Sequence, residues 1–182
     1  TVTGAMLDLT RPDLDCGIRF GDGKWSGVTT TLIGGRAYQP VCAPELLRAH
    51  PDLSDLTKIP VIADRTSMLD WPLWLKHAGH DPNMKLSGPV YSDASLAFDA
   101  AISGQGLLLA ADMMSADPVC DGRLVRPFAA PVDGVHGYYL ATAKGRRESK
   151  KLKLFRDWLD EEVPASVGGY LAQQQGHVRA AH

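Results

Sequence analysis

Short strand-like segments alternate with helical segments along most of this chain, and this alternation is the strongest constraint on its fold. Val28–Ile33 is rich in β-branched residues, which favours a strand. Gly106–Ala111 is an apolar run without alternation, which is typical of a strand buried on both faces. The clearest helix is Ser149–Glu162, where apolar residues recur at helical spacing before Pro164. Strands that alternate with helices predict an α/β fold with mostly parallel sheets.

The remaining segments extend the same pattern. Ser92–Ser95 offers N-cap residues for a helix at Leu96–Ser103, which Gly104 ends. Further helices are expected near residue 44 and at 69–78, and further strands at 14–20, 37–42, 58–63, 88–91, 123–125 and 138–142.

Composition excludes several classes of protein. The 182 residues include 19 Lys and Arg against 21 Asp and Glu, so a strongly basic nucleic-acid-binding domain is excluded. No apolar run approaches the roughly 20 residues that span a bilayer. Cys16, Cys42 and Cys120 are widely spaced and odd in number, so we expect reduced thiols in a cytoplasmic protein. The start Thr1–Gly4 has neither Met nor a signal peptide, so a fragment of a longer protein is expected.

Two local patterns suggest chemistry but are better explained as structure. Gly21–Gly27 follows a strand like a dinucleotide-binding loop, yet the next segment continues as a strand instead of the helix that such a site needs. We interpret it as a turn at the carboxyl end of a strand, where ligands of α/β proteins commonly lie. His77 and His80 have a spacing that can chelate a metal, but Gly79 interrupts the helix between them, which favours surface histidines.

Two other patterns leave two interpretations open. The hydroxyls and backbone N–H groups of Ser92–Ser95 can bind an anion at a helix start, or they can simply cap that helix. The basic residues between Lys144 and Lys153 are typical of a solvated helix face, with phosphate contact as the alternative.

An ordered set of motifs resembles the LysR-type transcriptional regulators, above all the subgroup that controls glycine cleavage and β-lactamase induction. Its first motif, Leu14–Trp25, resembles the family's stretch of an acidic residue, Ile-Arg, an aromatic residue, Gly-x-Gly and Trp. The other matching segments are Tyr38–Leu47, Trp71–Gly79, Ser92–Gly106, Gly122–Phe128 and Phe155–Leu159.

The resemblance implies an α/β effector-binding domain of two lobes, similar to periplasmic binding proteins and joined by two crossing strands. It implies a first lobe of residues 1–42 plus 141–163, a second lobe of 43–140, and a C-terminal tail of 164–182. The crossings are expected near Tyr38–Cys42 and Tyr139–Ala143. The first lobe lacks the family's N-terminal strand and helix, so strand 16–20 is expected to lack a partner on one side. The DNA-binding winged helix-turn-helix is absent from this chain.

The resemblance also implies a small-molecule effector, anionic or peptide-like, that binds between the lobes. The expected effector-binding residues are Thr3, Phe20, Gly21, Asp22, Ser92, Asp93, Ser95 and Tyr139. Asp22 opposes an anion, so it is expected either to cap a backbone N–H or to bind an ammonium group. No catalytic residue, metal or cofactor is expected.

The expected assembly is a homodimer, with a tetramer in the full regulator, and helix 94–103 and the edge of the first lobe are the expected pairing surfaces. DNA is bound only through the missing domain, and no membrane contact is expected. Two alternatives remain: a solute-binding protein of the same fold, disfavoured because no export signal is visible, and a small hydrolase or transferase that uses Cys16, Cys42 or Ser95.

Overall fold

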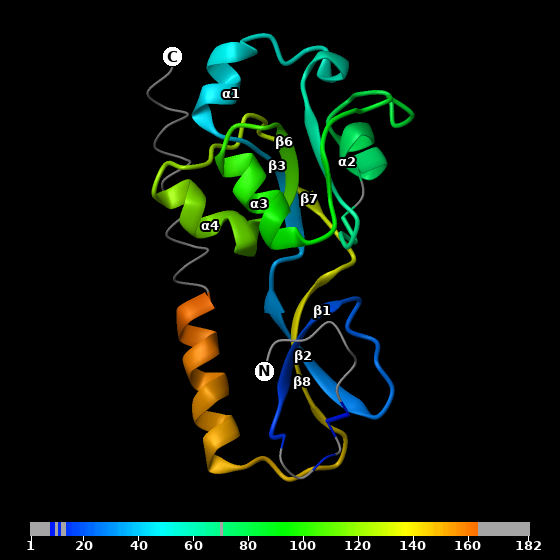
Figure 1. The fold of residues 1–182 in the computed structure, drawn as a ribbon. Helices are drawn as coiled ribbons and strands as arrows, with labels where there is room; N and C mark the ends of the chain where they lie inside the picture. Colours follow the sequence, from blue (N-terminus) through cyan, green and yellow to red (C-terminus); the bar gives the residue numbers. More distant parts are fainter. Residues whose placement is uncertain (1–7, 10, 12–13, 70, 164–182) are drawn as a thin grey trace. The chain divides into compact units, whose positions relative to one another are not determined.

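A computed structural model describes residues 8–163 except 10, 12, 13 and 70, and it divides the chain into two compact units (Figure 1). The first unit holds the chain up to Gly34 and again from Val135, and the second is Gly35–Gly134. These boundaries precede the expected ones by several residues. The reason is that the predicted crossing at 38–42 pairs within the second unit's sheet, whereas the crossing at 139–143 pairs within the first unit's sheet.

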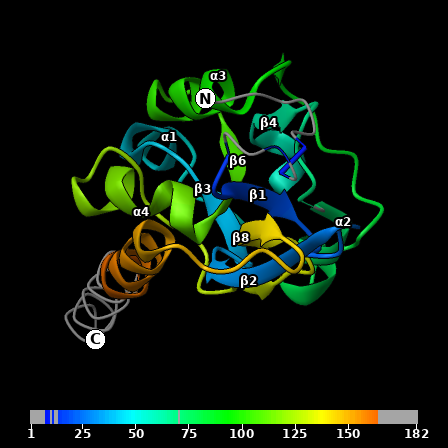
Figure 2. The same ribbon diagram turned by 90° about the horizontal axis from the view of Figure 1, so that it is seen from below.

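The first unit contains a three-stranded sheet in which the last strand lies in the middle (Figure 2). The order is β1 (Gly17–Gly21), β8 (Gly137–Ala143), β2 (Val28–Gly34), and both pairings are antiparallel. The expectation of mostly parallel sheets is therefore wrong for this unit. No crossover helix separates β1 from β2, and β8 returns from the second unit in the opposite direction to both. Within the described residues, β1 is paired on one side only, as expected for this strand.

A helix over residues 150–163 packs on this sheet and confirms the clearest prediction from the sequence. Leu152 and Leu159 are buried against Leu140 of β8, and Cys16 and Ile33 pack beside them. Apolar residues at helical spacing thus bury one stripe of the helix on one face of the sheet.

The second unit contains a five-stranded sheet with the order β5-β4-β6-β3-β7. The strands are β3 (Ala37–Val41), β4 (Val61–Asp64), β5 (Val90–Tyr91), β6 (Leu107–Ala111) and β7 (Val132–Asp133). The pairings among β5, β4 and β6 are parallel, and those of β3 with β6 and β7 are antiparallel. All five residues of β6 are buried, which confirms the prediction of a strand covered on both faces.

Helices cover both faces of this sheet. They are α1 (Pro44–Ala49), α2 (Trp71–His77), α3 (Ala94–Ile102) and α4 (Asp112–Cys120), with a 3₁₀ turn η1 (Leu56–Lys58). Apolar residues of α1, η1 and α2 pack on one face, whereas those of α3 and the end of α4 pack on the other. The sequence did not predict α4, because Pro118 lies inside it and no amphipathic spacing marks it. The strand expected at 123–125 is only an isolated bridge between Cys42 and Val125.

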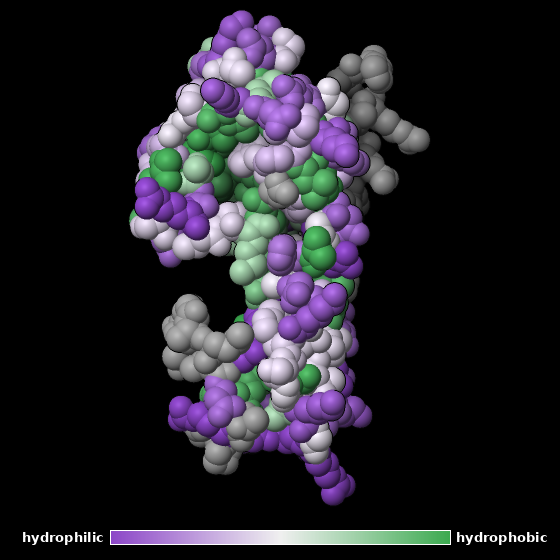
Figure 3. Space-filling view, turned by 90° about the vertical axis from the view of Figure 1, so that its right-hand side faces the viewer, coloured by the Kyte–Doolittle hydropathy of each residue, from purple (hydrophilic) through white to green (hydrophobic). Residues whose placement is uncertain are grey.

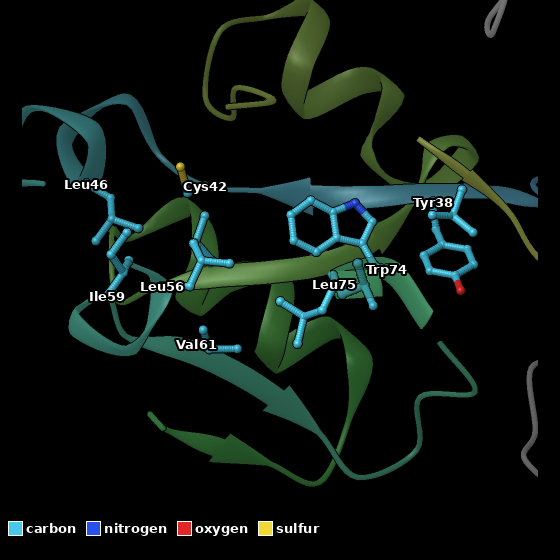
Figure 4. Packing of buried hydrophobic residues seen from close by; sticks show 11 residues of the cluster. Tyr38, Cys42, Leu46, Leu56, Ile59, Val61, Trp74 and Leu75 are labelled. Carbon is cyan, nitrogen blue, oxygen red and sulfur yellow. The ribbon is translucent and has the colours of Figure 1, made fainter. Parts of the chain in front are cut away.

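The larger of the two cores forms around Trp74, which is completely buried (Figure 4). The Trp74 indole packs edge-on against Phe128, with 5.0 Å between ring centroids, and its Nε1 donates a hydrogen bond to the Ala130 carbonyl at 2.8 Å. Figure 4 shows Leu46 and Ile59 at one end of this cluster and Tyr38 at the other. The core therefore joins α2 to the segment that precedes β7.

A buried polar cluster fastens the start of α4 to the segment that follows it. Arg126 Nη2 lies 3.1 Å from Asp112 Oδ1 and donates to Ser115 Oγ at 3.0 Å. The Gln39 amide, oriented to satisfy both of its groups, accepts from Arg126 Nη1 at 3.2 Å and donates to the Phe128 carbonyl at 2.9 Å. Burial raises the pKa of the Asp112 carboxyl, although Arg126 opposes that change. The carboxylate therefore depends on the guanidinium for its charge.

Replacing Arg126 alone is expected to destabilise the protein strongly. Arg126→Met leaves the Asp112 carboxylate buried without its cation, so the free energy of unfolding should fall by about 3–5 kcal/mol, measured by urea denaturation at pH 7. The double variant Asp112→Leu/Arg126→Met should recover most of this loss.

The pH dependence of Arg126→Met is a further check on the same ion pair. When folding raises the pKa of a carboxyl, the protonated group adds stability at pH values below its pKa in the unfolded state. This stability is lost as the pH rises through the pKa in the folded state. The deficit of the single variant should therefore shrink when the pH falls from 7 toward the ordinary Asp range. An equal deficit at both pH values would show that the carboxylate charge is not the cause.

Candidate functional site

The carboxyl ends of the parallel strands β4 and β5 carry two similar turns side by side. Asp64 pairs with Tyr91 at the end of the ladder, and the Arg65 N–H donates to the Tyr91 carbonyl at 3.0 Å. The turn Asp64–Thr66 follows β4, and the turn Asp93–Ser95 follows β5. Ligands of open α/β sheets commonly bind outside the carboxyl ends of the strands. This edge is therefore the candidate functional site of the second unit.

The Asp93 side chain caps the first turn of α3. Its Oδ1 accepts hydrogen bonds from the Ser95 N–H at 2.8 Å and from the Ser95 hydroxyl. Both hydrogen bonds lower the pKa of the exposed Asp93 carboxyl, and the one from the Ser95 hydroxyl has the larger effect. The sequence left anion binding and helix capping open for Ser92–Ser95, and in the structure these residues cap the helix. Ser92, Asp93 and Ser95 lie together at this edge, and all three are exposed.

The cap alters what this helix start can bind. The Asp93 carboxylate already occupies the Ser95 N–H and hydroxyl, so an anion in the same place would meet a negative charge. A ligand group that donates hydrogen bonds, such as an ammonium or an amide, suits this carboxylate better.

The turn after β4 is a feature that the sequence patterns did not predict. Asp64 Oδ1 accepts from the Thr66 N–H at 2.8 Å and from the Thr66 hydroxyl at 2.7 Å, which repeats the Asp93–Ser95 arrangement. Arg65 lies between them with an exposed side chain. The pattern Asp-x-Ser/Thr occurs near the carboxyl ends of both strands. The same hydrogen bonds form in Asp55–Thr57, so the pattern by itself indicates a turn and not a binding site.

In the first unit, the glycine-rich segment after β1 folds onto β8. Trp25 packs edge-on against Tyr139 at 5.8 Å between ring centroids, and the Arg19 guanidinium lies over the Trp25 ring at 5.6 Å. A Cβ on Gly23 would lie 2.6 Å from the Tyr139 ring, and Gly23 has a φ of +78°. Glycine is therefore required by both space and backbone conformation. The segment after this turn is strand β2, as predicted.

The structure separates some of the expected effector-binding residues of the first unit. Phe20 packs against Tyr138 at 4.9 Å between ring centroids, whereas Tyr139 packs against Trp25. Neighbouring residues of a strand point to opposite faces, so Phe20 and Tyr139 lie on opposite faces of the sheet. Asp22 Oδ1 accepts from the Lys24 N–H at 2.9 Å, which is the capping role considered for it. Thr3 lies outside the described residues.

The surroundings of Cys16, Cys42 and Ser95 do not activate these candidate nucleophiles. Burial raises the pKa of the Cys42 thiol to about 12. Burial, and then the nearby Asp15 carboxylate, raise the pKa of the Cys16 thiol. Both residues therefore stay protonated near neutral pH, and the Ser95 hydroxyl donates to a carboxylate rather than to an imidazole.

His77 and His80 lie in different surroundings and do not converge on a metal site. Among the described residues, no group of three or more His, Cys, Asp or Glu could hold a metal ion. His80 is half-buried and stacks on Trp74 at 6.2 Å between ring centroids, whereas His77 is exposed.

Nowhere in the described part of the chain is a helix both long and apolar enough to cross a membrane.

Comparison with known proteins identifies the family of the chain. A family model described as the LysR substrate binding domain matches residues 1–164. The chain belongs to this family. The Escherichia coli glycine cleavage system transcriptional activator is 31% identical over 155 residues, which cover 84% of this chain and 50% of that protein. The transcriptional activator AmpR of Rhodobacter capsulatus is 32% identical over 153 residues, which cover 84% of this chain and 52% of that protein. The chain thus spans about half the length of these relatives.

Solved structures of this family share the fold. The effector domain of AmpR from Pseudomonas aeruginosa has a TM-score of 0.74 and 28% identity, over 91% of this chain and 80% of that one. The regulatory domain of CrgA from Neisseria meningitidis has a TM-score of 0.70 at 18% identity, over 88% of this chain and 81% of that one, which supports the fold alone. These similarities confirm the expected two-lobe α/β fold of LysR effector-binding domains.

Substituting Gly23 is expected to loosen the segment that covers Tyr139. Gly23→Ala should cost the left-handed backbone penalty of about 1–2 kcal/mol and, in addition, a clash of about 1–3 kcal/mol, measured by urea denaturation. Gly27→Ala is the matched control, because Gly27 has a φ of +73° but nothing within 4 Å of the place that a Cβ would take. Equal losses in both variants would rule out packing on Tyr139 as the cause.

Proposed function

We propose that this chain is the effector-sensing part of a LysR-type transcriptional regulator. It binds a small molecule, and this binding modulates how an N-terminal winged helix-turn-helix of the longer protein holds DNA in the cytoplasm. The observation that carries the proposal is the pair of hydroxyl- and carboxylate-bearing turns at the ends of β4 and β5, in a chain of the LysR substrate binding family. The relatives named as transcriptional activators support the same conclusion.

The proposed effector site combines residues from the structure with residues from the resemblance. Ser92, Asp93 and Ser95 stay in the proposal, and Arg65 and Thr66 join them because β4 and β5 are paired neighbours. In the first unit, the resemblance gives Thr3, Phe20, Gly21, Asp22 and Tyr139 as candidate residues. Phe20 and Tyr139 lie on opposite faces of the sheet, so one small molecule cannot contact both side chains.

The charges at the strand ends favour an effector with groups of both signs. Arg65 offers an exposed guanidinium, the side chain best suited to bind a carboxylate in a bidentate manner. Asp64 and Asp93 offer carboxylates beside it at the same edge, which suit an ammonium or amide donor. An amino acid or a short peptide carries both groups. We therefore propose a peptide-like effector rather than a simple anion.

Arg65→Ala should weaken the binding of such an effector. Free amino acids and short peptides are titrated into the purified chain by calorimetry. Loss of a charge-assisted hydrogen bond is worth about 1.5–3 kcal/mol, so affinity for the binding compound should fall roughly 10- to 100-fold. Ser95→Ala should weaken binding by less. Arg48→Ala is the matched control, because Arg48 is exposed and pairs with Glu45 on α1. An unchanged affinity in Arg65→Ala would remove this edge from the site.

The two alternative functions make different predictions. A hydrolase or transferase would turn over ester, amide or phosphate substrates, and the raised thiol pKa values of Cys16 and Cys42 weigh against it. A solute-binding protein would bind its ligand without any effect on DNA. The regulator proposal requires that the effector change DNA binding by the longer protein, measured by fluorescence anisotropy.

We also propose that α3 takes part in a homodimer. Leu96 is 49% exposed on α3, so this helix presents apolar surface to solvent. Figure 3 shows hydrophobic patches among hydrophilic residues on the surface of the second unit. Burial of such apolar surface is a common driving force for association.

Leu96→Asp should shift the dimer toward monomer. A charge placed in an apolar interface is costly to bury, so the dissociation constant should rise at least tenfold, measured by sedimentation equilibrium. Leu73→Asp is the control, because Leu73 is exposed to a similar degree on α2. Equal dissociation in both variants, or none in either, would count against α3 as the interface.

A further inference from the structure

Positive charge is concentrated in the segment that leads from β8 into the helix over residues 150–163 (Figure 1). Residues 144–153 contain six Lys or Arg and one Glu, whereas the whole chain has 19 Lys and Arg against 21 Asp and Glu. We call these ten residues the basic segment. Its six cations are Lys144, Arg146, Arg147, Lys150, Lys151 and Lys153. A chain whose net charge is negative thus carries one local cluster of positive charge.

The backbone of the basic segment is anchored within the first unit. The Arg146 guanidinium donates to the Leu14 carbonyl, and its Nη2 donates to the Arg11 carbonyl at 2.9 Å. Ser149 Oγ accepts from the Leu152 N–H at 3.2 Å and so caps the start of the helix. The other cations are therefore displayed from a backbone with a defined conformation.

Internal contacts give no reason for this concentration of charge. Apart from Arg146, the cations of the basic segment are exposed, and within the described residues none of them forms an ion pair. The one carboxylate of the segment, Glu148, lies 2.9 Å from Arg156 Nη2 instead. Lys150 and Lys151 also lie in the first turn of the helix, where the positive amino end disfavours cations. These charges are thus available to a partner.

The chemistry of the basic segment fits the phosphate backbone of duplex DNA. Ammonium and guanidinium groups bind phosphate through charge-assisted hydrogen bonds. The segment has no aromatic side chain on which the bases of a single strand could stack. Further along the helix lie Asp157, Asp160, Glu161 and Glu162, which would repel an anionic membrane laid along it. A phosphate backbone can instead contact the basic end alone.

We propose that the basic segment binds the phosphate backbone of DNA, in addition to the winged helix-turn-helix of the longer protein. This inference rests on the proposed function, which gives the longer protein a site on DNA. Contacts with phosphates carry no sequence information. The basic segment therefore adds affinity without selecting the sequence that is bound.

The expected binding is weak and depends strongly on salt. Each phosphate that a protein neutralises steepens the fall of log affinity with log salt by about 0.9. With about four phosphates contacted, affinity should fall roughly 100-fold between about 50 and 200 mM salt. We expect a dissociation constant of about 10–100 μM at the lower salt concentration.

Neutral substitutions at the start of the helix test the proposal. The purified chain is titrated into a fluorescein-labelled DNA duplex of arbitrary sequence, and fluorescence anisotropy is measured at several salt concentrations. Lys150→Gln/Lys151→Gln should bind the duplex at least tenfold more weakly at low salt, with a salt dependence shallower by about 2 in slope. The variant should unfold at no lower temperature by circular dichroism, because two cations leave the positive end of the helix.

A matched control separates this segment from the effect of total charge. Lys76→Gln/Lys85→Gln loses the same charge from exposed positions of the second unit and should keep both the affinity and the salt slope of the natural chain. Equal weakening in both variants would mean that only total charge matters, which overturns the proposal. Absence of duplex binding by the natural chain at low salt also overturns it.

Other polyanions and the effector complete the test. Single-stranded RNA is titrated in the same way, and binding to vesicles of phosphatidylglycerol and phosphatidylcholine is measured by co-sedimentation. Tighter binding to either than to duplex DNA overturns the assignment of the partner. Calorimetry with the peptide-like effector distinguishes this inference from the proposed function. If the effector binds and changes DNA binding by the longer protein, but the chain itself does not bind the duplex, only this inference fails.

Discussion

Burial of β6 on both faces is the constraint on which the second unit depends. Leu107 and Leu109 belong to the core that contains Trp74, whereas Leu108 and Ala110 belong to the core beneath α3. A strand without a solvated face requires a helical layer on each side. The neighbouring part of the chain also lies close to the start of this strand. A Cβ on Gly106 would lie 2.5 Å from the Pro60 carbonyl oxygen, so only glycine fits there. β6 pairs in parallel with β4 and antiparallel with β3, and β4 pairs in parallel with β5.

The same pairing creates the candidate effector site. Because β4 and β5 are parallel neighbours, their carboxyl ends bring Asp64–Thr66 beside Ser92–Ser95. Each turn uses its own carboxylate to satisfy a backbone N–H and a hydroxyl. The helix start of α3 is thus already capped, and Arg65 is the cationic group of this edge. A site built in this way suits a ligand with both donor and acceptor groups better than an anion alone.

The glycine-rich segment after β1 has a role in packing that its resemblance to a nucleotide loop conceals. Gly21 and Gly23 lack side chains because Trp25 and Tyr139 occupy the space that a Cβ would need. Arg19 adds a cation–π contact to Trp25. The motif around Trp25 therefore orders a surface segment on β8.

Local patterns in the sequence determined the elements with strong signals. Helix 150–163 follows from apolar spacing, β6 from an unbroken apolar run, and α3 from its N-cap and Gly104. Tertiary structure alone decided which strands pair and in which direction. The central place of β8, the ion pair of Asp112 with Arg126, and the pairing of Asp64 with Tyr91 all join residues far apart in the chain. Such contacts leave no periodic trace in the sequence, because they arise when separate elements pack together.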